Sequence, residues 1–197
     1  MSSPLYFDGN SVAGYTMLAA AAARSAFLPM ASRHKKASPA IPDRMRVQWV
    51  PQATDRTLIK QTDELRCGPA CAEMLFADRG VLVGQSVIAT GLRLPTNGTH
   101  LAEAMNRAFG GLRWRGGSID ESASPLLVAN LCTAGSWAAL LEPSGVNHVG
   151  HWVVVDAVDV ERAVIVVRDP IGLAFGVPIV AFTALWRFTA LIVEQKR

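Results

Sequence analysis

Apolar residues change their spacing along the chain, which divides it into a helix-forming part and a strand-forming part. In the first part they recur every three or four positions, the period of a helix with one buried face, as at Leu101, Ala104, Met105 and Ala108. This pattern predicts helices over residues 67–78, 85–92, 100–109 and 126–132. From residue 136 onward, β-branched runs predict strands over 137–141, 150–158, 163–169, 177–180 and 188–193, with a turn of helix near 182–186. Helices followed by antiparallel strands are typical of an α+β fold.

Two of these strands form a predicted hairpin around the charged turn 159–162, and Pro170 ends the second strand because it cannot donate to a ladder. With the turn centred near residue 160, paired residues should have numbers that sum to about 320. His151 and Asp169 meet this condition, so we expect them to lie opposite each other with both side chains on one face. The carboxylate could then fix the tautomer of the imidazole, whereas a register slip of one residue would separate them.

Cys67 stands at the start of the helix predicted over residues 67–78. Gly68 and Pro69 follow it, and the first turn is the one place where a helix tolerates proline. The free N–H groups and positive dipole end of a helix favour thiolate, which is the reactive form of cysteine. A buried structural cysteine is the alternative interpretation. The amide of Gln61, six residues upstream, and the hairpin with its histidine and aspartate favour a nucleophile.

A nucleophile at a helix N-terminus, a base on a strand and an acid that orients the base form the triad of a cysteine peptidase. The motifs are Gln61, Cys67-Gly68-Pro69-Ala70-Cys71, His151-Trp152-Val153-Val154-Val155 and Asp169-Pro170. In these motifs, and over roughly residues 55–195, the sequence resembles the papain-like, bacteriocin-processing (double-glycine) peptidases. The resemblance implies a papain-like α+β fold, with a helical lobe that carries the nucleophile and an antiparallel sheet that carries the histidine and the aspartate.

The resemblance also implies a role for each site residue. Cys67 would be the nucleophile, His151 the general base and then acid, and Asp169 the group that orients His151. Gln61 would form an oxyanion hole with the backbone N–H of Cys67. Cleavage would follow a Gly-Gly pair. Arg66 departs from the pattern, because family members fused to exporters often have an acidic residue before the cysteine, and this puts the substrate preference in doubt.

Three residues are candidates for the wall of the substrate groove: Gly150, Trp152 and Trp114. For each tryptophan, a place in the buried core is the alternative.

Composition narrows the chemistry. The 197 residues carry 19 basic and 16 acidic side chains, a net charge of +3 that does not indicate a nucleic-acid surface. Three cysteines do not make a disulfide framework, and we expect no cofactor.

A zinc site is the rival reading of the cysteines and histidines, with the ligand set Cys67, Cys71, His148 and His151. Residues three apart at a strand start point to opposite faces, and zinc would not explain Asp169 or Gln61. These observations favour the triad, and we expect no metal.

Residues 1–50 look like an appendage to a peptidase domain at 51–197, with an alanine-rich helix at 17–28, a basic, proline-containing linker after it and a strand-like entry at 46–52. The appendage is interpreted either as a targeting, docking or inhibitory segment or as a tail. The apolar run 17–23 is too short to span a membrane, and Asp8 precedes it where a signal peptide would be basic.

Without a signal peptide, we expect a protein that is cytoplasmic as synthesised. One hypothesis is an interbacterial toxin that a specialised secretion machine delivers into a competitor cell and that an immunity protein neutralises in the producer. The alternatives are a stand-alone leader-processing peptidase, a deamidase or acyltransferase with the same triad, and a binding module without turnover.

Overall fold

The computed structural model describes residues 7–8, 56–119, 126–142, 150–159 and 161–194. The expectations for the helix at 17–28, the linker, the strand at 46–52 and His148 lie outside the described residues. Among the described residues, no helix is both long and apolar enough to cross a membrane.

The predicted helices are present, with adjusted ends. They are α2 (Cys67–Ala77), α3 (Gln85–Ile88), α4 (Gly98–Ala108) and α5 (Leu126–Cys132). Helix α3 is shorter than the predicted 85–92. Helix α4 begins earlier than predicted because Asn97 caps it: the Asn97 side-chain oxygen accepts a hydrogen bond of 2.8 Å from the backbone N–H of His100. The predicted turn of helix near 182–186 is a longer helix, α6 (Ile179–Leu185), so the strand predicted at 177–180 is wrong in its second half.

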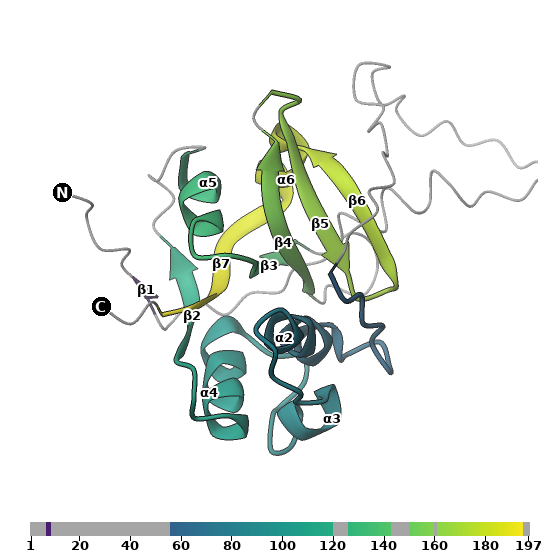
Figure 1. Cartoon of the computed structure of the whole chain (residues 1–197), viewed down its shortest axis with the longest axis vertical. Helices are drawn as coiled ribbons and strands as arrows, with labels where there is room; N and C mark the ends of the chain where they lie inside the picture. Colours follow the sequence, from purple (N-terminus) through teal and green to yellow (C-terminus); the bar gives the residue numbers. More distant parts are fainter. Residues whose placement is uncertain (1–6, 9–55, 120–125, 143–149, 160, 195–197) are drawn as a thin grey trace, which may run out of the picture.

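The strands form one antiparallel sheet with the order β1-β2-β7-β3-β4-β5-β6 (Figure 1). Their bounds are β1 (Phe7–Asp8), β2 (Trp114–Ile119), β3 (Trp137–Leu141), β4 (His151–Asp159), β5 (Val164–Asp169), β6 (Leu173–Pro178) and β7 (Trp186–Val193). Helices followed by an antiparallel sheet confirm the predicted α+β class.

Strand β2 was not predicted, because glycines interrupt its apolar pattern at Gly116 and Gly117. The structure gives the reason for one of them. A Cβ atom on Gly116 would overlap the backbone of Gly98, so glycine lets the start of α4 lie directly against β2.

The β4–β5 hairpin forms, but its predicted register is wrong by two residues. Val154 pairs with Arg168, so in this register Asp169 lies opposite Val153 instead of His151. A bulge between Val155 and Ala157 shifts the register by one more residue in the part of the hairpin nearer the turn. Because side chains alternate along a strand, an error of two keeps His151 and Asp169 on the same face, where they meet diagonally.

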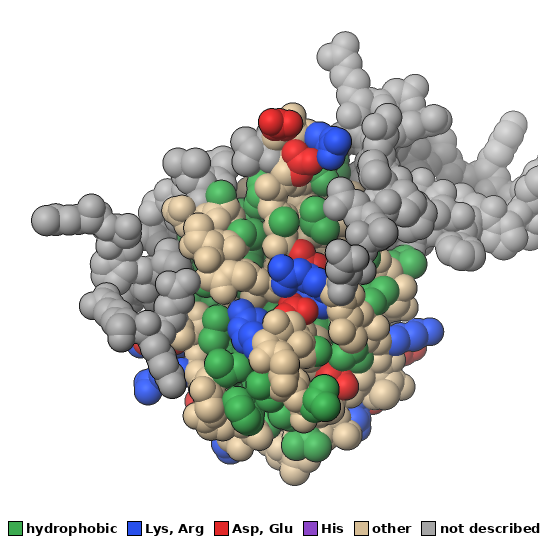
Figure 2. All heavy atoms as spheres, in the orientation of Figure 1, with side chains coloured by type: hydrophobic (Ala, Val, Ile, Leu, Met, Phe, Trp, Pro, Cys, Tyr) green, Lys and Arg blue, Asp and Glu red, His purple; other side chains and the backbone are tan. Residues whose placement is uncertain are grey.

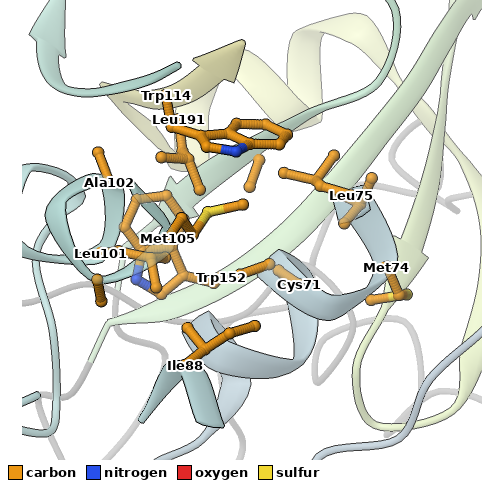
Figure 3. Packing of buried hydrophobic residues seen from close by; sticks show 14 of the residues in the cluster. Cys71, Met74, Leu75, Ile88, Leu101, Ala102, Met105, Trp114, Trp152 and Leu191 are labelled. Atoms are coloured by element: carbon orange, nitrogen blue, oxygen red, sulfur yellow. The ribbon is translucent and has the colours of Figure 1, made fainter. Parts of the chain in front are cut away.

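Apolar side chains pack on both faces of the sheet. On one face α5 and α6 cover a cluster around Trp137, Phe182 and Trp186. On the other face α2, α3 and α4 cover a second cluster, and Figure 3 shows its side chains converging between the helices and the sheet. Its labelled members include Cys71, Leu101, Met105, Trp114 and Trp152. This second cluster fixes the helix that begins with Cys67 against strand β4.

Candidate active site

Three element ends meet where the sequence predicted a triad. Cys67 is the first residue of α2, His151 is the first of β4, and Asp169 is the last of β5. Figure 1 shows α2 directly below the ends of these strands. The side chains are shielded from solvent, since Cys67 and His151 are each 4% exposed and Asp169 is 0% exposed, and no histidine is visible on the face drawn in Figure 2.

The start of α2 is open toward the site. No side chain caps it, and its first turn contains no acidic residue. Its free N–H groups and the positive end of the helix dipole are therefore available to a ligand. The sulfur of Cys67 lies 3.8 Å from the carbonyl oxygen of Gly150, the residue before His151. This contact brings the helix start and the strand start together.

Asp169 holds the ring of His151. The Nε2 atom of His151 lies 2.9 Å from Oδ1 of Asp169, and the same oxygen accepts a 2.9 Å hydrogen bond from the backbone N–H of Ile171. The backbone that follows Asp169 therefore holds the carboxylate in place, and the carboxylate holds the imidazole. With Nε2 turned to Asp169, the other ring nitrogen, Nδ1, remains for Cys67.

The electrostatics of His151 favour its protonated form. Burial by itself lowers the pKa of His151, but the charge and hydrogen bond of Asp169, together with a hydrogen bond and charge interaction with Cys67, raise it from 6.5 to about 10. An imidazole ring placed between a carboxylate and a sulfur atom can accept a proton and donate it again, as a general acid–base group does.

Gln61 lies beside the end of β5. Its backbone N–H donates to the carbonyl oxygen of Pro170 at 2.7 Å, which fastens it next to Asp169. Its side-chain nitrogen donates to the carbonyl oxygen of Asp63 at 2.7 Å, and Oε1 is buried without a partner in the described part of the chain. A carboxamide nitrogen carries two N–H donors, and the contact with Asp63 uses one of them.

The proposed groove tryptophans are core residues. Trp152 is 1% exposed, and its indole N–H donates to the carbonyl oxygen of Thr96 at 3.1 Å. Trp114 is 2% exposed and packs edge-on against Phe76, with the guanidinium of Arg79 over its ring at 4.9 Å. Each points into the cluster under the helices, so neither ring lines an open groove. The third predicted groove residue, Gly150, lies at the site, because its carbonyl oxygen is 3.8 Å from the sulfur of Cys67.

The residues of the alternative zinc set form no metal-binding group in the described part of the chain. No group of three or more potential ligand side chains is present there, and His148 lies outside it. Cys71 is 0% exposed, and burial raises its pKa well above the usual value, with the charge of Cys67 as the next contribution. A thiol of this kind is an inert core residue.

A buried charge network at the other end of α2 was not predicted from the sequence. Arg168 is 0% exposed and donates to both carboxylate oxygens of Asp156 at 2.8 Å, and to Asp78 at 2.6 Å. Asp78 follows the last residue of α2, so the network ties that helix to β4 and β5. A charged residue within the β-branched run 164–169 was the available signal, because a charge in a buried strand needs a partner.

A second missed residue is Gln85, at the start of α3. It is 7% exposed and forms hydrogen bonds to the backbone on both sides of Gln61. An amide in a short surface helix gave no signal in the sequence.

The fold is that of known peptidase domains. It matches a C39-like peptidase from Bacillus anthracis with a TM-score of 0.58 and 14% identity, over 72% of this chain and 96% of that chain. It matches the peptidase domain of Streptococcus ComA, a bi-functional ABC transporter, with a TM-score of 0.56 and 16% identity, over 72% and 99%. It matches a double-glycine motif protease from an AMS/PCAT transporter, solved with its leader peptide, with a TM-score of 0.56 and 18% identity, over 72% and 92%. The chain therefore has the papain-like fold that the motifs predicted.

One curated relative is close in sequence. The chain is 39% identical over 119 residues to Cysteine protease effector 1 of Escherichia coli. The match covers 60% of this chain and 22% of that protein, so the chain spans about a fifth of the relative's length. No protein-family model matches the sequence.

Proposed function

We propose that the chain is a cysteine peptidase in which Cys67 is the nucleophile, His151 the proton carrier and Asp169 the group that orients His151. The observation that carries the proposal is the position of the His151 ring, with Nε2 2.9 Å from Asp169 and an interaction with Cys67 at the open end of α2. The fold and the relative named as a cysteine protease effector support the same chemistry.

In the proposed reaction, the thiolate of Cys67 attacks the carbonyl carbon of the scissile peptide bond. The negative charge that develops on the carbonyl oxygen is stabilised by the backbone N–H of Cys67 and by the free N–H of Gln61. His151 gives its proton from Nδ1 to the departing amine, and a thioester to Cys67 remains. Water then gives a proton to His151 and attacks the thioester, which releases the acid and restores the thiolate with an imidazolium beside it.

We propose cleavage after Gly-Gly as the substrate preference. Two neighbouring residues without a Cβ atom fit a narrow site, and Cys67 and His151 leave only 4% of their surfaces exposed. One solved structure of the same fold is named as a double-glycine motif protease, which supports this preference.

The decisive experiment compares a bacterial lysate treated with the wild type with one treated with Cys67→Ala. Mass spectrometry records new protein N-termini and altered glutamines in the same samples. We expect new termini after Gly-Gly only with the wild type. Deamidated or cross-linked glutamines in place of new termini would keep the triad but replace peptide hydrolysis with deamidation or acyl transfer.

We further propose that the peptidase acts as an effector, delivered into a competitor cell and held in check in the producer by an immunity protein. The support is the name of the curated relative, Cysteine protease effector 1. Production in bacterial cytosol should slow growth with the wild type and leave it normal with Cys67→Ala. Normal growth with a wild-type protein that cleaves in vitro would refute a toxic role and leave leader processing as the alternative.

A further inference from the structure

The segment that carries Gln61 is held by the side chain of Gln85. The Gln85 side-chain oxygen accepts a hydrogen bond of 3.1 Å from the backbone N–H of Thr62, and its nitrogen donates at 3.0 Å to the carbonyl oxygen of Lys60. The hydroxyl of Thr62 reaches the same oxygen at 3.2 Å. The carboxamide therefore binds the backbone immediately before and immediately after Gln61.

This arrangement imitates a strand partner. In a parallel ladder, one residue bonds with its N–H and C=O to the two backbone groups that flank the residue opposite. The Gln85 carboxamide supplies such a donor and acceptor, while on the other side the N–H of Gln61 itself bonds to Pro170. Gln61 is thus fixed from both sides, although its segment is not part of the sheet.

Gln85 is in turn anchored to the helix of the nucleophile. Both its backbone N–H, at 2.8 Å, and its side-chain nitrogen, at 3.4 Å, donate to one carboxylate oxygen of Glu73. Glu73 lies in α2, which begins with Cys67. The chain of contacts from α2 through Glu73 and Gln85 to the backbone around Gln61 connects the two proposed donors of the oxyanion hole.

We infer that Gln85 is a positioning residue of the oxyanion hole, which holds the amide of Gln61 at a fixed place relative to the N–H of Cys67. The inference rests on the proposed function, because it assigns Gln85 an effect that passes through Gln61. Preorganised donors stabilise the charge that develops in the transition state, and an unanchored donor must be ordered at that moment. Gln85 touches neither Cys67 nor His151 in the contacts described. Its effect should therefore reach the reaction through the oxyanion and appear in kcat.

The test is a double-mutant cycle with Gln61→Ala, Gln85→Met and the double variant in the full chain. The substrate is a p-nitrophenyl ester of a blocked Gly-Gly dipeptide, whose reaction with Cys67 passes through an oxyanion. Gln61→Ala should lower kcat on the order of 10²–10³-fold, as for the loss of one oxyanion-hole donor. Gln85→Met should lower kcat about 10-fold or more with KM within about two-fold, and the double variant should be no slower than Gln61→Ala within about three-fold.

A second readout separates positioning from general damage. Alkylation of Cys67 by iodoacetamide forms no oxyanion, so its rate in Gln85→Met should stay within about two-fold of the wild type. Gln85→Glu keeps an acceptor for Thr62 but turns a carboxylate oxygen toward the carbonyl oxygen of Lys60 and toward Glu73, so its kcat should fall at least as far as that of Gln85→Met. Ser86→Ala, the exposed neighbour in α3, is the matched control and should leave kcat unchanged.

The possible failures are distinct. Losses that multiply in the double variant, or an alkylation rate that falls in parallel with kcat, would overturn the role of Gln85. Full activity of Gln61→Ala would instead refute Gln61 as an oxyanion donor. Equal rates for the wild type and Cys67→Ala would refute the proposed function itself.

Discussion

His151 contacts Asp169 along a diagonal of the β4–β5 hairpin: Nε2 and Oδ1 are 2.9 Å apart, while the residue across the ladder from Asp169 is Val153. A diagonal contact needs a side chain long enough to cross it, which the imidazole is and a shorter polar residue is not. The hairpin therefore sets both the distance and the direction of the ring, and it leaves Nδ1 for Cys67.

Loss of Asp169 should weaken catalysis less than loss of Cys67. In the proposed mechanism, Asp169→Ala leaves the base in place but removes the group that orients it, so we expect kcat/KM to fall on the order of 10²–10⁴-fold. Cys67→Ala removes the nucleophile and should lower it further, on the order of 10⁶-fold. Kinetics with the Gly-Gly ester measure both. Equal losses for the two variants would mean that Asp169 does more than orient His151.

Stability should fall with rising pH in a window set by His151. Its folded-state pKa of about 10 lies above the unfolded value of 6.5, so protonation stabilises the fold below pH 6.5, and this contribution is lost as pH rises toward 10. Urea unfolding across this range should show a loss on the order of a few kcal/mol in the wild type that is much smaller in His151→Gln. His100→Gln, on the exposed face of α4, is the control and should follow the wild type. Parallel curves for the wild type and His151→Gln would contradict the raised pKa.

Arg168 should matter far more for stability than an exposed arginine in an ion pair. Arg168→Met removes the buried cation from Asp78 and Asp156 and leaves them the more exposed Arg56, 3.4 and 3.9 Å away, so it should cost about 3 kcal/mol in the free energy of unfolding. Arg162→Met removes an exposed pair with Asp159 and should cost less than about 1 kcal/mol. Urea denaturation compares them.

A second set of substitutions checks the reason for the loss. Changing Asp78 and Asp156 to Asn in the Arg168→Met background removes charges that the more exposed Arg56 compensates only in part, and it should restore part of the stability. A further decrease would mean that Arg56, together with the hydroxyl of Ser136, stabilises the carboxylates without Arg168.

Gly68 should not tolerate a methyl group. A Cβ atom there would lie 3.0 Å from Thr96 and 3.1 Å from Trp152, closer than ordinary packing allows. We expect Gly68→Ala to lower the free energy of unfolding by about 1–3 kcal/mol, despite the better helix propensity of alanine, and to lower kcat because Cys67 is the adjacent residue.

Gly110→Ala is the matched control, since nothing lies within 4 Å of its added Cβ atom, and it should unfold like the wild type. Thermal unfolding measures both variants. A stabilised Gly68→Ala would show that Trp152 can move away at little cost.

The sequence predicted what depends on local pattern. It placed Cys67 at a helix start, assigned the hairpin and kept His151 and Asp169 on one face, because alternation tolerates an error of two residues. It could not predict the bulge after Val155 or the diagonal contact, since both depend on how β4 twists against β5.

Contacts between segments far apart along the chain could not be predicted from the sequence. Gln85 contacts Thr62 over 23 positions, and Arg168 contacts Asp78 over 90 positions, and neither pair follows a periodic pattern. Strand β2 was missed because two glycines interrupt its pattern, and one of them, Gly116, is needed for the close approach of α4. The sequence pattern was compatible with Trp152 either in a groove wall or in the core, and the tertiary packing places it in the core.

The place of β7 in the sheet has a consequence for how the protein acquires its activity. β7 is last in sequence among the described strands, yet it lies between β2 and β3 and pairs with both. Until residues 186–193 are synthesised and inserted, no described strand pairs β2 with the part of the sheet that carries His151 and Asp169. Such long-range closure is slow and comes late in folding. A nascent chain would therefore carry the thiol of Cys67 before the sheet is complete, and the proposed peptidase activity would arise only after translation has passed β7.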